Sequence, residues 1–227
     1  SPVMAEDFTQ WVVDDHFAAA RPDLTQVGVT FTKNVDPYEE AKIRILNGGH
    51  TCLAYLGALA GHHTFDQAMA DPELFAHFEE FERGEVLPAL VEALPFDKNL
   101  YLDQIIMRFK NASIGDTVER ICADGYLKFP IFIHPTLAGC LKQGILPRAG
   151  LRAIASWYVF CKHIEAGTLP IAYGEPYWDN LRELLQAGQV DRFARSASLW
   201  GTLPQDHPEF TPALIAAITE MEKKWPV

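Results

Sequence analysis

Apolar residues recur at helical spacing along nearly the whole chain of 227 residues, and this pattern predicts a mainly α fold. At 48% hydrophobic residues, a chain of this length can build one large domain with a substantial core. The segment 26–32 is the exception, because Val27, Val29 and Phe31 alternate with other residues as they do in a strand. We find neither an internal repeat nor a low-complexity linker. We therefore expect a single multi-helical domain over residues 1–227, with one short strand near its N-terminus.

Helix-capping patterns mark the starts of several helices. Thr64 and Gln67 have the spacing of a capping box, and Asp71 and Pro72 suit the start of the next helix. That helix turns a set of apolar residues inward, namely Leu74, Phe75, Phe78 and Phe81. The remaining helices are predicted over residues 5–19, 85–93, 101–110, 116–126, 134–142, 148–166, 177–187 and 190–196, and from Thr211 and Pro212 onward.

The composition also restricts the partners. Lys and Arg total 19 against 30 Asp and Glu, so the formal net charge of -11 argues against nucleic acid and anionic membranes. No apolar run is long enough to span a bilayer, and the N-terminus lacks the basic and apolar regions of a signal peptide. The four cysteines are far apart in the sequence and form no CxxC pair. We therefore expect a cytoplasmic protein with reduced, buried thiols and no metal site.

The segment 36–61, DPYEEAKIRILNGGHTCLAYLGALAG, begins like a capped helix but carries polar groups within an apolar pattern. Asp36 can act as the N-cap, Pro37 fits the first helical position, and Glu39 suits the positive end of the helix. The segment is therefore predicted to be a helix that enters the protein interior.

Three polar side chains of this helix share one side. At about 100° per residue, Lys42, Asn47 and His50 point to roughly 0°, 140° and 80°. Gly48 and Gly49 stand beside them in mid-helix, where each glycine costs roughly 1 kcal/mol relative to alanine. That cost is tolerable where another backbone or a ligand must approach closely.

An amine, an amide and an imidazole on one face suit the oxidation of a secondary alcohol. A lysine can remove the hydroxyl proton, an asparagine NH₂ can stabilise the developing alkoxide, and a histidine can hold the reacting oxygen. A structural interpretation is also open, in which Lys42 is a surface lysine, His50 a core histidine and the glycines a packing notch. Spacing alone favours the structural interpretation, because K-x₄-N-x₂-H is a short pattern and many helices carry polar faces.

Beyond these local patterns, PYEEAKIRILNGGH resembles the signature of the polyol-specific long-chain dehydrogenases/reductases. The segments EDFTQWVV, VGVTFTKNV, MRFKNASIGDTVERICADGYLKFP and HPTLAGCLKQG are similar to family segments in the same order. The resemblance therefore covers essentially the whole chain. It implies a mainly α C-terminal domain similar to that of 6-phosphogluconate dehydrogenase. It also implies metal-free chemistry with NAD or NADP, which an N-terminal Rossmann domain would mainly bind.

The resemblance also assigns roles to residues. It implies that Lys42 is the general base in alcohol oxidation and the general acid in ketone reduction. Asn47 would contribute to the pocket for the alkoxide oxygen, and His50 would bind substrate hydroxyls. Arg120 and Lys128 would bind the far end of the polyol. An ordinary surface ion pair is the other open interpretation of these two cations. Its candidate partners are Asp116, Glu119 and Asp124.

The substrate is a finer question. The segments GTLPIAYGEPYWD and FARSASLWGTL resemble those of D-arabinitol dehydrogenases, which favours D-arabinitol and D-xylulose, with mannitol and fructose next. The first alternative is a sugar-acid oxidoreductase of the fructuronate or mannonate type, since Arg120 and Lys128 could bind a carboxylate. The second is a non-catalytic helical interaction domain. Because the chain has no GxGxxG fingerprint, we expect its Rossmann domain to lie outside these residues and this part alone to be inactive.

Overall fold

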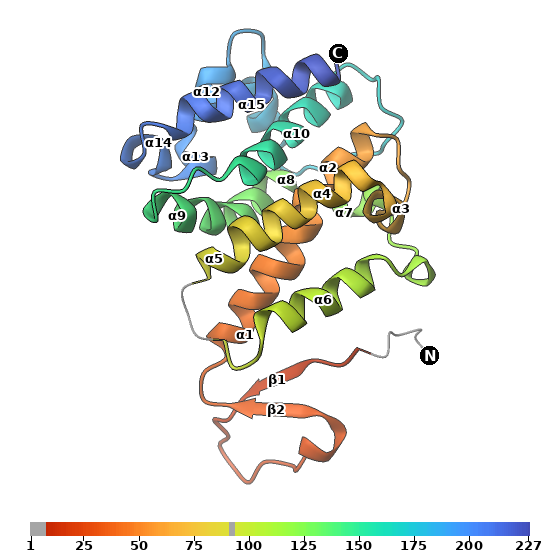
Figure 1. Cartoon of the computed structure of the whole chain (residues 1–227), viewed down its shortest axis with the longest axis vertical. Helices are drawn as coiled ribbons and strands as arrows, with labels where there is room; N and C mark the ends of the chain where they lie inside the picture. The colour runs from red at the N-terminus through yellow and green to blue at the C-terminus, as the bar shows by residue number, and fades with distance from the viewer. Residues whose placement is uncertain (1–7, 91–93) are drawn as a thin grey trace.

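Helices make up most of the computed structural model, which describes residues 8–90 and 94–227 (Figure 1). The first helices are α1 (Asp36–Ala41), α2 (Gly48–Leu59), α3 (Phe65–Ala70), α4 (Pro72–Phe81), α5 (Leu87–Ala89), α6 (Lys98–Phe109), α7 (Val118–Cys122) and α8 (Gly125–Lys128). They are followed by α9 (His134–Lys142), α10 (Arg148–Glu165), α11 (Trp178–Leu185), α12 (Val190–Ala194), α13 (Ala197–Trp200), α14 (Leu203–Asp206) and α15 (Phe210–Lys224). This architecture confirms the predicted mainly α class.

Short segments of other helical types connect or extend these helices. The π-helical segments are η2 (Lys42–Asn47), η3 (Glu82–Val86) and η5 (Phe129–Ile133). The 3₁₀ turns are η1 (Thr25–Val27) and η4 (Ala112–Ile114). The π-helical segment η2 contacts both η3 and η5. Single π turns are rare and occur frequently at functional sites. The region where η2 contacts η3 and η5 is therefore a candidate location for a functional site.

Helices α2 and α10 pack against each other at the centre of the molecule, and α10 also packs against α15 (Figure 1). Nearly every residue of α2 is buried, because its sequence is small or apolar on all sides. Tyr55 of α2 places its ring 5.2 Å from that of Phe160 in α10, edge to face, and both rings are fully buried. The predicted catalytic residues therefore lie on a chain segment that leads into the core.

A two-stranded parallel sheet lies at the end of the molecule opposite to α15 (Figure 1). Its strands are β1 (Trp11–Asp14) and β2 (Val29–Thr32), and β2 confirms the predicted strand. The helix predicted over 5–19 is wrong in its described part, where β1 forms; residues 5–7 lie outside the described residues. Val12 and Val13 are β-branched and favour a strand, and pairing with β2 overrides the helical spacing of the apolar residues.

The predicted caps are largely confirmed. Thr64 and Gln67 form the capping box at the start of α3, and the Asp71 side chain caps α4 by accepting hydrogen bonds from backbone N–H groups. Asp36, by contrast, lies inside the first turn of α1 rather than at its N-cap. Likewise, α15 begins at Phe210 and not at the threonine and proline that follow it.

Two predicted helices have different boundaries. The helix expected over 85–93 is a continuation of α4, because α4, η3 and α5 form one uninterrupted helical run; residues 91–93 lie outside the described residues. The helix expected over 116–126 is divided into α7 and α8. Asp124 separates them with a left-handed backbone, at φ 60°, which an α-helix does not tolerate.

Candidate active site

The predicted catalytic residues Lys42, Asn47 and His50, hereafter the predicted trio, lie where η2 passes into α2. Lys42 and Asn47 are the first and last residues of η2, and His50 lies in the first turn of α2. In a π-helix the hydrogen bonds join residues five apart, so Lys42 and Asn47 lie about one turn apart on the same side. The α-helical estimate had placed them about 140° apart. The π conformation therefore reduces the angle between Lys42 and Asn47 relative to the α-helical value.

The members of the trio differ in solvent exposure. Lys42 is exposed, whereas Asn47 and His50 are partly buried. In the described part of the chain, no hydrogen bond or ion pair engages the Lys42 amine, the Asn47 amide or the His50 imidazole. These polar groups are available to a ligand. The described residues do not themselves enclose the Lys42 amine, so a water-excluded cleft around it would need a further covering element.

Aromatic rings hold the imidazole of His50. The Phe109 ring stacks on it at a centroid distance of 4.1 Å, and the Phe65 ring meets it edge to face at 4.7 Å. Burial lowers the pKa of His50 to about 4, and the positive charges of Arg120 and Lys128 act in the same direction. The imidazole is therefore neutral at physiological pH, with one nitrogen able to donate and the other able to accept a hydrogen bond.

His50 lines a small cavity of about 130 Å³. The other residues around this cavity are Leu46, Phe65, Asp66, Arg108, Phe109, Asn111, Ile114 and Asp116. Within the described part of the chain, neither Lys42 nor Asn47 lines it. The structure therefore brings His50 together with an arginine and two carboxylates, while the amine and the amide of the trio lie outside this cavity.

Arg120 and Lys128 lie close enough to His50 to disfavour its protonation electrostatically. Arg120 Nε donates to Asp116 Oδ1 at 2.6 Å, and its side chain is 68% exposed, which is the surface ion pair of the structural interpretation. The Lys128 amine instead donates to the backbone carbonyl of Ile121 at 2.9 Å. Burial lowers the pKa of Lys128. The ion-pair interpretation therefore holds for Arg120, and the substrate-binding role of both cations stays a prediction.

The paired glycines beside the trio are explained by close packing. A Cβ atom added to Gly49 would lie 2.7 Å from Glu82 Oε1 and 2.9 Å from a ring atom of Phe78. A Cβ atom added to Gly48 would lie 3.2 Å from the backbone oxygen of Phe132. Another backbone and neighbouring side chains therefore make the close approach that the glycines permit, in agreement with the packing-notch interpretation.

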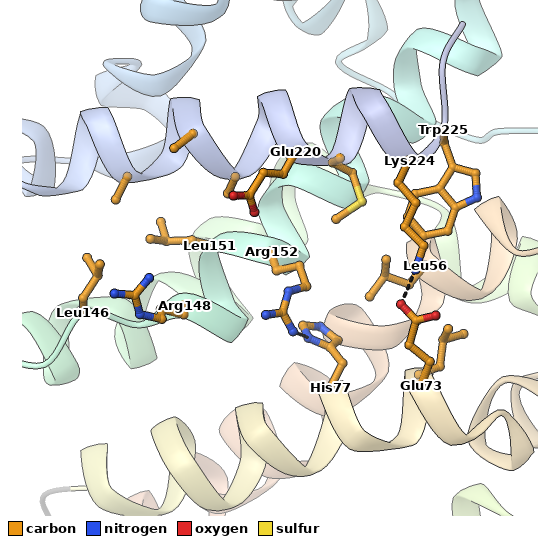
Figure 2. Close-up of a pocket in the computed structure, with 15 residues that line it drawn as sticks. Leu56, Glu73, His77, Leu146, Arg148, Leu151, Arg152, Glu220, Lys224 and Trp225 are labelled. Carbon is orange, nitrogen blue, oxygen red and sulfur yellow. Dashed lines mark hydrogen bonds and ion pairs between the residues drawn. The ribbon is translucent and has the colours of Figure 1, made fainter.

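A larger cavity of about 490 Å³ lies between α4, α10 and α15, as Figure 2 shows. Arg152 and His77 point toward each other inside it, and Arg152 Nη1 is 3.1 Å from His77 Nδ1. Lys224 and Glu73 form an ion pair beside them. None of the site residues predicted from the sequence lines this cavity. Volume alone therefore does not identify the site that the sequence predicts.

Arg108 and Asp116 are cavity residues that sequence reasoning missed as candidates. Asp116 was considered only as an ion-pair partner. Both lie in the segment MRFKNASIGDTVERICADGYLKFP, which resembles its counterpart in the polyol dehydrogenases, and that location was the available signal. The four cysteines are free and buried, as predicted. Among the residues that the structure describes, no cluster of His, Cys, Asp and Glu could hold a metal ion, and no helix could cross a membrane.

Comparison with known proteins places this architecture in a family. Residues 34–222 match the mannitol dehydrogenase C-terminal domain. The chain is 38% identical over 206 residues to D-arabinitol 4-dehydrogenase of Klebsiella pneumoniae, which covers 89% of the chain and 45% of that protein. It is 40% identical over 182 residues to mannitol 2-dehydrogenase of Cereibacter sphaeroides, which covers 80% of the chain and 38% of that protein.

A solved structure agrees with these relatives. The Pseudomonas fluorescens mannitol 2-dehydrogenase, in a ternary complex with NAD and D-mannitol, superposes with a TM-score of 0.86 at 32% identity. The match covers 96% of this chain and 44% of that one. The chain thus spans less than half the length of these similar proteins. The family resemblance seen in the sequence is confirmed, and the chain belongs to the mannitol dehydrogenase family, in which it corresponds to the C-terminal domain.

Proposed function

We propose that this chain is the catalytic helical part of an NAD(P)-dependent polyol dehydrogenase that interconverts a sugar alcohol and a ketose. The observation that supports the proposal is the π turn η2, which has Lys42 as its first and Asn47 as its last residue, about one π turn apart, and leads directly into the first turn of α2 with His50. The polar groups of these side chains have no partner in the described part of the chain. The substrate class is supported by relatives that are D-arabinitol 4-dehydrogenases and mannitol 2-dehydrogenases.

The proposed mechanism moves a proton through Lys42. In alcohol oxidation its neutral amine accepts the proton of the substrate hydroxyl as a hydride leaves the same carbon. Asn47 donates a hydrogen bond to that oxygen as negative charge develops on it. His50, neutral because burial lowers its pKa to about 4, fixes a substrate hydroxyl by donating or accepting a hydrogen bond. In ketone reduction the Lys42 ammonium returns the proton. A nicotinamide cofactor supplies the hydride acceptor or donor.

We place most of the cofactor site in an N-terminal Rossmann domain outside this chain. The relatives are more than twice as long as the part that this chain matches, and the chain has no GxGxxG fingerprint. The sheet supports the same proposal. Parallel strands are normally part of larger, covered sheets, yet β1 and β2 pair only with each other in the described part, and Trp11 is 56% exposed. The same domain would cover the exposed Lys42 amine.

D-Arabinitol and D-xylulose are the favoured substrate pair, with mannitol and fructose next. A sugar acid of the fructuronate or mannonate type is the second candidate. The observation that favours it is the set of three cations that act on the His50 imidazole, Arg108, Arg120 and Lys128, which Asp116 opposes. In either case Arg120 and Lys128 would bind the end of the substrate remote from the reacting carbon.

The test is NADH or NADPH formation by the full-length protein with D-arabinitol, D-mannitol and D-mannonate, compared with the 227-residue chain alone. We expect turnover by the full-length protein, fastest with D-arabinitol, and none by the chain alone. Faster turnover of D-mannonate than of either polyol would show that the substrate is a sugar acid and not a polyol. Absence of turnover with all three substrates would favour the non-catalytic interaction domain, and NADH formation by the chain alone would contradict the proposed division of the site.

A further inference from the structure

Arg44 lies in the middle of η2, between Lys42 and Asn47, and its side chain turns into the protein. Arg44 is only 4% exposed. Its Nε atom donates a hydrogen bond to Thr136 Oγ1 in α9 at 3.0 Å, and its Nη1 atom donates to Glu40 Oε1 in α1 at 2.9 Å. A single side chain therefore ties the turn that carries the predicted amine and amide to α9 and, through an i,i+4 pair, to the end of α1, which continues directly into η2.

A buried carboxyl group in the contacting segment η3 also acts electrostatically on Arg44. Glu82 in η3 is fully buried, and within the described residues neither of its carboxyl oxygens has a hydrogen-bond partner. Arg44 Nη2 is likewise buried without a partner. Burial raises the pKa of Glu82 well above its usual range, while the Arg44 charge opposes that rise. The segments η2 and η3 are in contact, and Glu82 Oε1 lies against Gly49.

Stability alone does not explain why the Arg44 guanidinium and the Glu82 carboxyl group are buried. Taking a guanidinium and a carboxyl group out of water costs several kcal/mol, and apolar side chains of similar volume often give a fold that is at least as stable. What a buried polar anchor can supply is a fixed orientation of the element that carries it. A fixed conformation of η2 matters for the predicted trio, because in an α-helix Asn47 would point about 140° away from Lys42.

We propose that Arg44 is a positioning residue, which holds η2 in its π conformation through Thr136 and Glu40 so that Lys42 and Asn47 face the same side. Arg44 does not touch the substrate in this account, because its guanidinium is buried and bonded to Thr136 and Glu40, whereas Lys42 is exposed. The inference rests on the proposed function, since it concerns the residues that carry the proposed proton transfer.

Substitutions of Thr136 test the anchor with little change in shape. Thr136→Val keeps the volume of this fully buried side chain and removes the oxygen that accepts from Arg44, whereas Thr136→Ser keeps that oxygen. In the full-length enzyme we expect Thr136→Val to lower kcat by about tenfold, because small displacements of catalytic groups have large effects on rate. We expect Thr136→Ser to stay within about threefold of the wild type. Arg44→Lys, which keeps the charge but not the guanidinium fork, should behave like Thr136→Val.

The primary isotope effect on kcat distinguishes two causes of a lower kcat, namely misplaced catalytic groups and a loss of folded protein. With a polyol deuterated at the oxidised carbon, misplaced groups slow the hydride step and raise the isotope effect on kcat. Partial unfolding removes active molecules and leaves the isotope effect unchanged. We therefore expect a larger isotope effect for Thr136→Val and a wild-type value for Thr136→Ser. Equal kcat values for the two variants, or a loss of kcat with an unchanged isotope effect, would overturn the positioning role.

Amide hydrogen exchange tests the anchoring role of Arg44 without relying on enzyme activity, so a failure of this inference can be told from a failure of the proposed function. Thr136→Val should speed exchange of the backbone amides of η2 relative to those of the central helix α10, because an anchor of the turn is lost. Unchanged exchange in η2 would overturn the inference whatever the enzyme does. Faster exchange in η2, in a protein that shows no dehydrogenase activity even as wild type, would instead contradict the proposed function and leave Arg44 as the anchor of the turn.

Discussion

His50 and His77 show how the same residue type can have different tasks in one fold. His50 is partly buried between aromatic rings beside the small cavity and has no hydrogen-bond partner in the described part of the chain. His77 is 5% exposed and fully bonded: Arg152 donates to its Nδ1 at 3.1 Å, and its Nε2 lies 3.2 Å from Cys52 Sγ. The unpartnered imidazole is the one free to bind a ligand, and the bonded imidazole is part of the structure.

His77 gives a pH-dependent prediction for stability. Burial lowers its pKa to about 3, below the usual 6.5 that applies to the unfolded chain. Its contribution to stability is therefore complete above pH 6.5 and is lost as the pH falls from 6.5 toward 3, because only the unfolded chain binds the proton. The stability difference between wild type and His77→Asn should shrink by about 1.4 kcal/mol per pH unit over this range. Urea unfolding of the two proteins at several pH values measures this difference in the free energy of unfolding.

The comparison with His77→Asn isolates this histidine from other groups. Burial raises the pKa of Glu85 to about 7, so Glu85 shifts stability with pH in the opposite direction, but it does so equally in both proteins. A stability difference that is constant between pH 7 and pH 4 would show that His77 is not held neutral in the folded state.

Gly49 gives a prediction about packing beside the trio. Gly49→Ala would place a Cβ atom 2.7 Å from Glu82 Oε1, and we expect it to lower the free energy of unfolding by about 1–3 kcal/mol through overpacking. Gly84→Ala is the matched control, because a Cβ atom there meets nothing within 4 Å. It should raise stability by up to about 1 kcal/mol. Equal effects of the two substitutions in urea unfolding would contradict the packing explanation for Gly49.

At the scale of elements, the sequence predicted those features that depend on local periodicity. Helices α9 and α10 match their predicted ranges closely, because each has a long apolar stripe and a clear start. Strand β1 was missed because its conformation depends on pairing with β2, which local spacing does not reveal. The π turn η2 was missed because no residue pattern distinguishes it from an α-helix, and it changes how the predicted trio is arranged.

The buried polar residues of η3 were missed for a different reason. Glu82 and Glu85 follow Phe78 and Phe81 at a spacing of four, so both continue the apolar stripe of α4 into the core. A carboxylate on such a stripe is a signal for a buried polar group. The partners of Glu85, however, are the N–H groups of Ala149 and Gly150, which are distant in the chain and cannot be found from periodicity.

Glu85 gives a prediction about how α10 begins. Its Oε1 accepts the N–H of Ala149 at 2.7 Å and its Oε2 accepts the N–H of Gly150 at 2.8 Å, so it caps the first turn of α10 from the opposite helix. Glu85→Ala should lower the free energy of unfolding by about 2–5 kcal/mol, because two buried N–H groups lose their acceptors. Glu183→Ala, which removes an exposed ion pair with Arg192, should change it by less than about 1 kcal/mol.

Urea unfolding of both variants measures the difference. Similar effects of the two substitutions would show that the buried cap contributes no more than a surface ion pair. The helix α10 packs against both α2 and α15, so a loss of its first turn would weaken the centre of the molecule.

At the scale of the whole molecule, helix α1, which leads directly into η2, lies near β1 and β2, at the end of the molecule opposite to α15 (Figure 1). The large cavity between α4, α10 and α15 lies elsewhere (Figure 2). The exposed Lys42 directly follows α1 in the chain, and α1 lies beside the parallel strands β1 and β2, which pair only with each other among the described residues (Figure 1). We propose that this end faces the N-terminal Rossmann domain and that the active site forms between that domain and this chain.

The most direct test of this account is the pH dependence of polyol oxidation by the full-length protein carrying Lys42→Ala. Lys42 is exposed, so the substitution should leave the fold intact. In the wild type the rate of oxidation should depend on pH, because the proposed step transfers the substrate's proton to the Lys42 amine. In Lys42→Ala we expect kcat to fall by roughly 10²–10⁴-fold and this pH dependence to disappear. Lys142→Ala, at an exposed lysine in the last turn of α9, should behave as the wild type. Wild-type turnover and an unchanged pH profile in Lys42→Ala would contradict the account.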